Sequence, residues 1–395
     1  MRVLQINAVC SNGSTGRICE NISRTLKKHG VDNVVLFFSG KSNYALSKKI
    51  SNRLYIKLQA FKSRIFGNYG FNSKKATKKV ISFIKEYRPD IIQIHNIHGH
   101  DIDLYDFFTF LKKTNIKVFY TFHDCWAFTG YCTHFDYEKC QKWKNKCNNC
   151  PQRKLYSWFF DKSSKNFQIK KDLLTEVDMT IITPSIWLKS IVEQSFLSNK
   201  TIKVINNGID LSVFNPVSSN FRKKYCIEKK FILLGVANCW SYKKGIDVFV
   251  RLAKTLSSYY QIVLVGTNKT IDKMLPQNII SIHKTNNQSD LAQIYFSSDL
   301  FVNPTREDTF PTVNIEALAC GTPVLTFGTG GSPEIIDDTC GSVVQRDDFD
   351  KLVLEINRIS HEKPFSRENC RKKAACFNAD SKYREYLELY GIRAK

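Results

Sequence analysis

The chain has 395 residues, a formal net charge of +23, and 43% hydrophobic and 13% aromatic residues. This length exceeds what one hydrophobic core serves, so we expect two domains, and the apolar content excludes a disordered chain. The chain start has too short an apolar run for a signal peptide, and no stretch reaches the roughly 20 apolar residues of a membrane-spanning helix. We therefore expect a cytoplasmic protein whose 13 cysteines are reduced or bind metal, rather than forming a disulfide framework.

Positive charge is concentrated in one stretch of the first half. Between Lys41 and Tyr87 there are twelve Lys or Arg residues and a single acid, Glu86. Apolar residues recur there at spacings of three and four, which predicts one face of a helix: Ile50, Leu54, Leu58, Phe61 and Ile65. A basic amphipathic helix is typical of a membrane-surface element, but a helix packed on its own domain with a solvated basic side explains the pattern equally well.

Strand-like apolar runs alternate with helix-like segments, which predicts parallel sheets with crossover helices. In the first half we expect strands at Val3–Ile6, Val34–Phe37, Ile91–Ile94, Val118–Phe122 and Met179–Thr183. The helices expected between them are Arg17–His29, Thr77–Tyr87, Leu104–Lys113 and Ile186–Gln194. In the second half the expected strands are Phe231–Val236, Ile262–Val265, Ile279–Ile282, Leu300–Val302 and Val324–Phe327. The helices expected there are Ile246–Leu256, Leu291–Ser297 and Val313–Cys320.

The two halves are separated by a linker-like stretch near Asn206–Lys230, which contains turn and Pro/Ser/Asn signals. We predict an α/β protein with two doubly wound, Rossmann-like domains that face each other across a cleft. Ligands of such sheets bind at the carboxyl ends of the strands. The predicted parts are an N-terminal domain at 1–212, with a basic segment at 41–80 and a cysteine-rich loop at 125–160, a C-terminal domain at 213–377, and a helix at 378–395 that returns to the first domain.

Two acids eight residues apart follow the predicted strand Leu300–Val302. Asp308 lies in the loop after the strand, and Glu316 lies in the next helix, which ends at Gly321. Free N–H groups in the first turn of that helix suit a phosphate or a developing negative charge, and a carboxylate can accept hydrogen bonds from both hydroxyls of a ribose diol.

The run from Asp308 to Val324 resembles the E-x7-E signature of retaining glycosyltransferase family four, which has the GT-B fold. The resemblance continues through Gly330–Ile336, and it extends upstream to Lys243–Asp247, Asn206–Asp210 and Thr183–Leu188. It therefore covers nearly the whole chain in the same order. The resemblance implies that Glu316 holds the donor ribose, that Lys244 neutralises the donor diphosphate, and that Asp308 faces the donor sugar near the backbone amides of Thr309 and Phe310.

The sequence departs from the family pattern at two positions. The first acid of the motif is Asp308 with Glu307 beside it, so either residue could fill the role. The basic residue that usually precedes the family's lysine is replaced by Asn238-Cys239-Trp240, and Lys243 is its candidate substitute.

In the first half, two features follow predicted strands. The loop Ser11–Gly16, with Gly13 and Gly16, could cradle phosphate, although a tight turn is also a structural need of this fold. His123 follows the strand at Val118–Phe122, and His95 occupies the equivalent place after Ile91–Ile94. The resemblance implies that His123 is the family's active-site histidine, which contacts donor sugar and acceptor.

The loop after His123 is rich in cysteine. Cys132, Cys140, Cys147 and Cys150 include one C-x-x-C pair, and four thiolates satisfy a tetrahedral structural zinc. Cys125 and His134 are alternate ligands, and reduced thiols or a disulfide also fit the pattern. Four thiolates leave no open coordination position, so no catalytic metal is expected.

These features predict a cytoplasmic, retaining hexosyltransferase that uses a nucleoside-diphosphate sugar. The basic segment suggests a lipid-linked surface-polysaccharide or O-antigen acceptor and peripheral binding to an anionic membrane, on the inner face of the plasma membrane. The alternatives are a sugar-nucleotide epimerase, a sugar phosphate synthase, an inactive relative, or a nucleic-acid-binding protein. No nucleic acid partner is expected, because no reader motif accompanies the charge.

Overall fold

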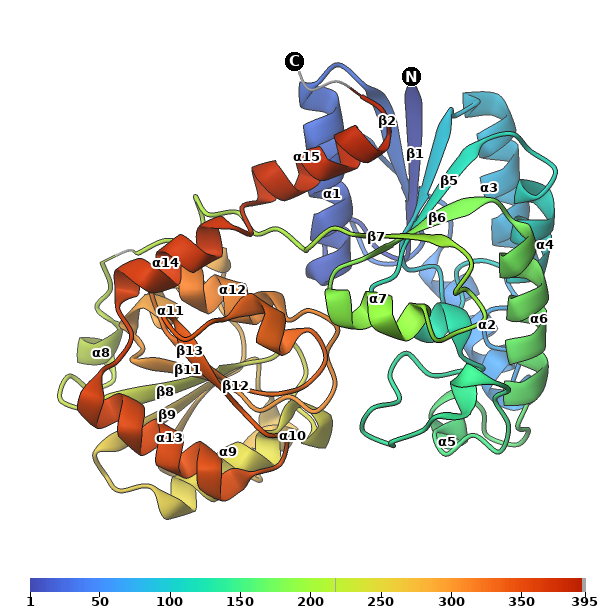
Figure 1. The fold of residues 1–395 in the computed structure, drawn as a ribbon. Coiled ribbons are helices and arrows are strands. Elements are labelled where there is room, and N and C mark those ends of the chain that lie inside the picture. The colour runs from blue at the N-terminus through green and yellow to red at the C-terminus, as the bar shows by residue number, and fades with distance from the viewer. Residues whose placement is uncertain (217, 393–395) are drawn as a thin grey trace. The chain divides into compact units, whose positions relative to one another are not determined.

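The computed structural model describes residues 1–216 and 218–392. The chain divides into two compact units: unit 1 comprises Met1–Asn206 and the chain from Lys382 onward, and unit 2 comprises Asn207–Ser381. Each unit contains one parallel sheet with helices on both faces (Figure 1). The predicted fold class, two doubly wound α/β halves, is confirmed.

Unit 1 has a seven-stranded sheet with the order β3-β2-β1-β4-β5-β6-β7, in which all neighbours are parallel. The strands are β1 (Arg2–Asn7), β2 (Asp32–Phe37), β3 (Ser47–Lys49), β4 (Ile91–Ile94), β5 (Lys117–Thr121), β6 (Met179–Thr183) and β7 (Thr201–Val204). The helices are α1 (Gly13–Lys28), α2 (Arg53–Phe66), α3 (Lys74–Tyr87), α4 (Leu104–Leu111), α5 (Arg153–Tyr156), α6 (Ser163–Glu176), α7 (Ile186–Val192) and α15 (Ala379–Leu389), with 3-10 turns η1 (Trp126–Phe128) and η2 (Lys142–Lys144).

Different helices cover the two faces of this sheet (Figure 1). On one face α3, α4 and α6 pack their buried apolar side chains against the strands. On the other face lie α1 and α15, and the C-terminal segment is fixed by polar contacts as well as by packing. The Tyr390 hydroxyl donates to Gln93 Oε1 at 2.8 Å, and the Tyr386 hydroxyl lies 3.3 Å from Thr121 Oγ1.

Unit 2 has a six-stranded sheet with the order β10-β9-β8-β11-β12-β13, again parallel throughout. The strands are β8 (Phe231–Val236), β9 (Tyr260–Val265), β10 (Ile279–Ile282), β11 (Leu300–Asn303), β12 (Val324–Phe327) and β13 (Gly341–Val344). The helices are α8 (Phe221–Lys224), α9 (Ile246–Thr255), α10 (Lys269–Asp272), α11 (Gln288–Ser297), α12 (Thr312–Ala319), α13 (Phe349–Glu362) and α14 (Arg367–Ala375), with 3-10 turns η3 (Tyr242–Lys244) and η4 (Ser332–Ile335).

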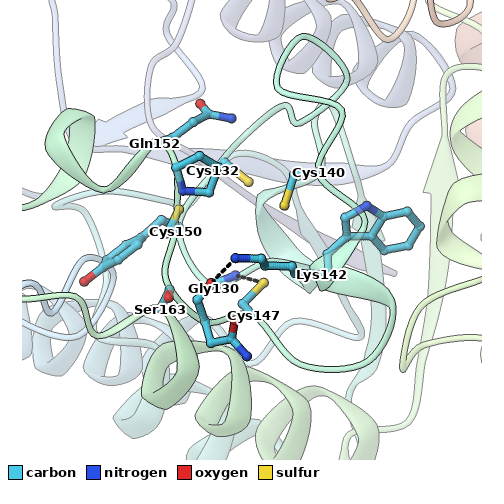
Figure 2. Close-up of a pocket in the computed structure, with 12 residues that line it drawn as sticks. Gly130, Cys132, Cys140, Lys142, Cys147, Cys150, Gln152 and Ser163 are labelled. Carbon is cyan, nitrogen blue, oxygen red and sulfur yellow. Dashed lines mark hydrogen bonds between the residues drawn. The ribbon is translucent and has the colours of Figure 1, made fainter.

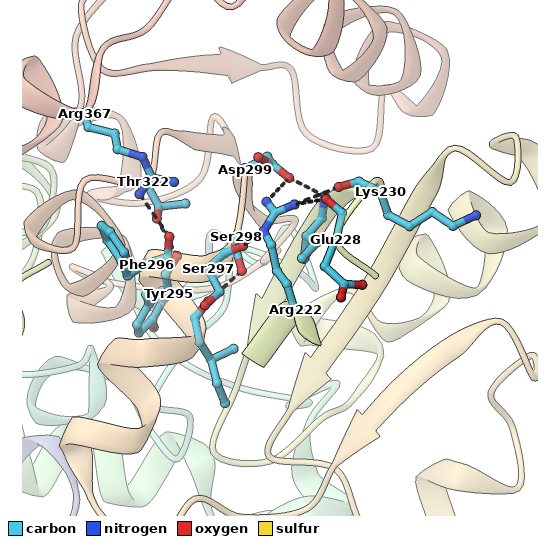
Figure 3. A network of polar contacts seen from close by, with 12 residues as sticks. Arg222, Glu228, Lys230, Tyr295, Phe296, Ser297, Ser298, Asp299, Thr322 and Arg367 are labelled. Atoms are coloured by element: carbon cyan, nitrogen blue, oxygen red, sulfur yellow. Dashed lines mark hydrogen bonds and ion pairs between the residues drawn. The ribbon is translucent and has the colours of Figure 1, made fainter. Parts of the chain in front are cut away.

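The core of unit 2 has two layers. Helices α9 and α13 bury their apolar faces on one side of the sheet, and α11, α12 and α14 do so on the other. Arg222 links the starts of two adjacent strands, β8 and β11, as Figure 3 shows. Its guanidinium pairs with Asp299 at 2.6 Å and donates to the Ser297 and Lys230 carbonyls. Since Asp299 also accepts from the Ile232 N–H, this network ties the start of β8 to the start of β11.

Of the apolar stripe predicted for the basic segment, Ile50 is buried ahead of α2 and Ile65 is half-buried, but Leu54, Leu58 and Phe61 on α2 face solvent. Leu54 is 78% exposed and Phe61 is 53% exposed, whereas the polar side chains of Gln59 and Ser63 are buried. The exposed part of the stripe is therefore not covered by its own domain, whereas Tyr55 and Ile56 of the same helix pack against the core of unit 1. Within the described residues, no helix is long and apolar enough to cross a bilayer.

Candidate functional site

In unit 2, the two lysines and the first acids of the motif lie in loops that follow adjacent strands. Strand β8 pairs with β11, although β9 and β10 intervene in the sequence. The loop after β8 carries Lys243 and Lys244, and the loop after β11 carries Glu307 and Asp308. Ligands of doubly wound sheets bind beyond the carboxyl ends of strands where the strand order reverses, and both loops lie at such a point.

Two lysine–carboxylate pairs connect these loops. Lys244 Nζ lies 2.7 Å from Asp308 Oδ2, and Lys243 Nζ lies 2.7 Å from Glu307 Oε2. The Lys244 ammonium also donates to the Glu307 carbonyl at 3.4 Å. Each acid of the Glu307-Asp308 dipeptide therefore has its own lysine, and a bound anion would meet both positive charges at the same edge of the sheet.

The close approach of the loops depends on two glycines in the left-handed region. Gly245 has φ of 76°, and a Cβ added there would lie 2.5 Å from the Pro304 carbonyl oxygen. Gly330 has φ of 55°, and its added Cβ would lie 1.6 Å from the Asp308 carbonyl oxygen. No side chain fits at either position, so glycine lets the loop after β8 approach the loop after β11 at Pro304, and lets the loop after β12 approach it at Asp308.

The side chain of Asp308 accepts a hydrogen bond from the backbone of its own loop. Asp308 Oδ1 accepts from the Phe310 N–H at 3.2 Å. This contact is a local turn that presents the loop just before α12 begins at Thr312. A ligand that takes the Phe310 amide would have to displace the Asp308 carboxylate, while Pro311, which has no N–H, only shapes the loop.

Glu316 lies on α12 and is held by Tyr295 of α11. The Tyr295 hydroxyl donates to Glu316 Oε2 at 3.1 Å, and both side chains are buried. Tyr295 is held in turn by the Thr322 hydroxyl, which donates to its carbonyl at 2.6 Å (Figure 3). Tyr295 is a positioning residue that the sequence did not reveal, because it lies 21 residues before Glu316 with no motif of its own.

Arg306 was also missed by the sequence analysis. Its buried guanidinium donates to both Asp247 carboxylate oxygens, at 2.8 and 2.9 Å, and to Asp347 at 2.6 Å. It also lies 4.2 Å from the centroid of the Tyr242 ring. Because Asp247 opens α9 and Arg306 follows β11, this cation locks the lysine loop to the acid loop. Because its N–H donors are taken by these two carboxylates, Arg306 stabilises the loops and is not available to bind a phosphate.

In unit 1, the glycine loop lies at the carboxyl end of β1. Gly13 begins α1 and Gly16 lies in its first turn. The Ser11 N–H donates to the Gly16 carbonyl at 3.1 Å, and Asn7 Nδ2 donates to the Val9 carbonyl at 2.7 Å. The loop is thus a tight turn fixed by its own backbone.

His123 and His95 lie side by side after β5 and β4. His95 Nδ1 is 3.1 Å from His123 Nε2, the rings stack with centroids 5.4 Å apart, and His95 Nε2 lies 3.2 Å from Gln5 Oε1. Burial lowers the pKa of His123 to about 4 and the pKa of His95 well below its ordinary value. Both imidazoles are therefore neutral near pH 7, and they can exchange hydrogen bonds without carrying charge.

Beside this pair is a charged one. His98 Nε2 lies 3.0 Å from Asp124 Oδ2. Burial opposes ionisation of both groups, but their mutual attraction outweighs it, so the pKa of His98 is raised and that of Asp124 is lowered. Burial raises the pKa of nearby Asp101 to about 7. The sequence carries no motif for these three residues, which follow β4 and β5 in the same loops as His95 and His123.

The four cysteines of the loop are brought together in unit 1. Cys132, Cys140, Cys147 and Cys150 all line one small pocket, as Figure 2 shows. The alternate ligands Cys125 and His134 do not line it. No disulfide forms among the cysteines of the described residues. In the same residues, no group of three or more His, Cys, Asp or Glu side chains already stands in a metal-coordinating arrangement.

Family comparisons agree with this arrangement of sheets and loops. The family model "Glycosyltransferase Family 4" matches residues 15–213, and "Glycosyl transferases group 1" matches residues 217–376. The fold and the matched families define a glycosyltransferase of the GT-B type. The chain belongs to glycosyltransferase family 4.

Individual proteins support the same class. A protein of Escherichia coli (strain K12) that carries the name colanic acid biosynthesis glycosyl transferase is 21% identical, over 99% of both chains. Sucrose-phosphate synthase from Thermosynechococcus elongatus superimposes with a TM-score of 0.76 at 17% identity, covering 99% of this chain and 98% of the other. The Anabaena protein Alr3699/HepE in complex with UDP-glucose gives a TM-score of 0.71 at 14% identity over 99% of both chains.

The neutral histidine pair predicts a dependence of stability on pH. Because the pKa of His123 falls from about 6.5 in the unfolded chain to about 4 in the fold, the unfolded state binds more protons in this window. Stability should therefore be lost as pH falls from about 6.5 to about 4. His123→Asn should remove up to about 3 kcal/mol of this loss, because each pKa unit corresponds to about 1.4 kcal/mol.

Thermal melts at intervals across this pH range would measure the effect. His361→Asn, on the exposed end of α13, is the matched control and should melt with the pH dependence of the unmodified chain. If His123→Asn keeps that dependence too, His123 is not the group that resists protonation.

Proposed function

We propose that this glycosyltransferase is a retaining hexosyltransferase that moves a hexose from a nucleoside-diphosphate sugar to a hydroxyl of a lipid-linked surface-polysaccharide or O-antigen intermediate. The observation that carries the proposal is the arrangement of Lys244, Asp308 and Glu316 in unit 2. They supply a cation, an acid and a buried carboxylate at the carboxyl ends of adjacent strands.

The donor class follows from the chemistry of these groups. The Glu316 carboxylate can accept hydrogen bonds from a ribose diol, and Tyr295 fixes its orientation. Lys244 can neutralise a diphosphate, and Lys243 is the second cation in reach of the same edge. Asp308 or its neighbour Glu307 would face the sugar, next to the amides of Thr309 and Phe310. The UDP-glucose complex of a protein with this fold supports the same donor class.

The proposed transfer needs no reactant other than the donor and the acceptor. The bond between the sugar anomeric carbon and the diphosphate oxygen breaks, and a bond from that carbon to the acceptor oxygen forms on the same face. The acceptor's proton passes to the departing phosphate oxygen. Lys244 and the first-turn amides of α12 stabilise the charge that develops on the diphosphate. His123, being neutral, would orient the sugar or acceptor by hydrogen bonding rather than as a cation.

The acceptor class rests on two observations. The relative that matches along the whole chain is named for colanic acid biosynthesis. An exposed apolar patch in unit 1 consists of Leu54, Leu58 and Phe61 of α2 together with Trp158, Phe159 and Phe160. These two parts are continuous, because the Phe61 and Trp158 rings are 5.9 Å apart and the Trp158 N–H donates to the Arg64 carbonyl at 2.7 Å.

The surroundings of this patch favour an anionic membrane as its occupant. Exposed cations of the basic segment lie on the same helix, among them Arg53, Lys57 and Lys62. Aromatic side chains suit the bilayer interface, and each Lys or Arg near an anionic surface adds about 1 kcal/mol. The enzyme would then work peripherally on the cytoplasmic face of the plasma membrane, where it would meet a lipid-linked acceptor.

The donor proposal predicts a defined effect of Glu316→Gln. A hydrogen bond to a charged group contributes about 1.5–3 kcal/mol, so the variant should bind the donor about 10- to 100-fold more weakly. Tyr295→Phe, which only loosens the carboxylate, should have a smaller effect. Calorimetric titration with a panel of nucleotide sugars, followed by KM with the donor that binds, would measure both.

The control for this series is Glu355→Gln, which removes the same charge at a site paired with Arg358 of α13. It should leave donor affinity unchanged. Equal donor affinity in Glu316→Gln and Glu355→Gln would refute the ribose contact. Conversion of the donor in the absence of any acceptor would favour an epimerase over a transferase.

The two adjacent lysines are predicted to differ. Lys244→Met should lower kcat about 100- to 1000-fold, as expected for loss of one charge-stabilising donor in a transition state. Lys243→Met is the matched control and should affect kcat less. Its partner is Glu307, whereas the acid at the first position of the E-x7-E motif is Asp308. Steady-state kinetics of both variants would separate the roles, and a greater loss of kcat in Lys243→Met would reverse the assignment.

Membrane binding is tested with vesicles. The full chain should float with phosphatidylglycerol vesicles at low salt, and less at high salt. Since burying an aromatic side chain contributes about 1.5–3 kcal/mol, Phe159→Ser should weaken binding about tenfold or more. Leu354→Ser, which removes an equally exposed apolar side chain from α13, should float normally. Absence of flotation for the unmodified chain would exclude the membrane as occupant of this patch.

A further inference from the structure

The segment after β5 is long and has little regular structure. Between Cys125 and Lys162 it contains the short turns η1 and η2 and the single-turn helix α5. Loops of this length inside compact units are uncommon unless an additional interaction orders them. This segment nevertheless packs tightly: Trp143 stacks on Phe135 at 4.7 Å and meets the edge of Phe128 at 5.5 Å.

The four cysteines that line the pocket come from three places in this segment: Cys132, Cys140, and the turn that carries both Cys147 and Cys150. Figure 2 shows Cys132, Cys140, Cys147 and Cys150 grouped around it. The cavity measures about 20 Å³, which is room for about one water-sized sphere and too little for a sugar or nucleotide. We propose that these four cysteines bind one structural zinc ion as thiolates.

The second shell already contains groups that suit a cluster of thiolates. The Gly130 N–H donates to Cys147 Sγ at 3.2 Å. Ser163 Oγ is buried in the pocket wall and has no hydrogen-bond partner in the described residues. A thiolate is a better acceptor than a thiol, so deprotonation of a neighbouring cysteine would give this hydroxyl a partner.

The charge balance of the site also favours the ion. Zinc binding releases four thiol protons and leaves a complex of charge −2. Lys170 of α6 is fully buried close to the loop, where its ammonium donates to the Trp126 carbonyl at 2.7 Å and the Thr129 carbonyl at 3.0 Å. A buried cation needs negative charge nearby, and the thiolate complex supplies it.

The turn between Cys147 and Cys150 is pre-shaped. Asn149 has φ of 40°, and Lys142 Nζ donates to the carbonyls of Asn148 and Asn149 at 3.1 Å each. The Cys150 N–H donates to Asp161 Oδ2 at 2.7 Å. No three ligand side chains of the described residues yet stand at coordinating positions, so binding requires the thiols to close on the ion by side-chain rotation.

The site is structural, because four thiolates leave no position for substrate or water. Its ion would join the turn at Cys132, the chain at Cys140 and the Cys147–Cys150 turn. It would thereby fix the loop that leaves the sheet beside His123 and Asp124. The proposal is independent of the donor and acceptor chemistry.

The test is the metal content of the full chain, purified without chelators or an affinity metal. Elemental mass spectrometry should find about one zinc per chain. Cys147→Ser/Cys150→Ser should lose the zinc, and Cys226→Ser/Cys239→Ser, at exposed positions of unit 2, should retain it. Absence of zinc from the unmodified chain, together with no uptake of added zinc after reduction, would overturn the proposal.

A second measurement does not depend on whether the ligand variant folds. In the unmodified chain, iodoacetamide should leave these four thiols unlabelled until a strong chelator is added, and cobalt should give the absorption of a tetrahedral tetrathiolate complex. Labelling of all four thiols without metal release, or two disulfides joining them in the native chain, would contradict the site.

Discussion

The candidate donor half depends on backbone-to-backbone contact at its loops. Gly245 lies against Pro304, and Gly330 lies against Asp308, at separations that no Cβ allows. Because the loops touch through main chain, Arg306 can reach Asp247 and each lysine can reach a carboxylate. The parallel sheet fixes where the strands end, but it is this contact that brings a cation and an acid from different crossovers to one point.

In unit 1, the residues at the carboxyl ends of the strands are arranged differently. There the polar side chains are buried in two pairs. The imidazoles of His95 and His123 are neutral and contact each other, and beside them His98 and Asp124 form an ion pair. The chain then leaves the sheet into the cysteine loop, whose aromatic side chains join the core of unit 1, and buried Lys170 of α6 lies over the ring of Trp126. Rigid packing so close to His123 limits the orientations that its ring can adopt.

The sequence predicted the inner strands well, since continuous apolar runs such as Phe231–Val236 are buried on both faces. It missed β3 and β7 because edge strands are half-exposed and polar in part. It missed α6, whose buried face includes Lys170 and Asn166, and also β13, α13 and α14. The family motifs identified Lys244, Asp308 and Glu316. They did not give the contact of Lys244 with Asp308 or that of Glu316 with Tyr295, because each contact joins residues that are far apart in the sequence.

The Lys244–Asp308 pair has a consequence for selectivity among anions. Any phosphate that approaches Lys244 competes with a carboxylate already held at 2.7 Å. An anion held at Lys244 alone would have to offset the loss of this counterion from its own binding free energy. The proposed donor, which its ribose would anchor at Glu316, would have further contacts to offset that loss. Under the proposed function, the internal pair would therefore favour an anchored nucleotide sugar over free inorganic phosphate.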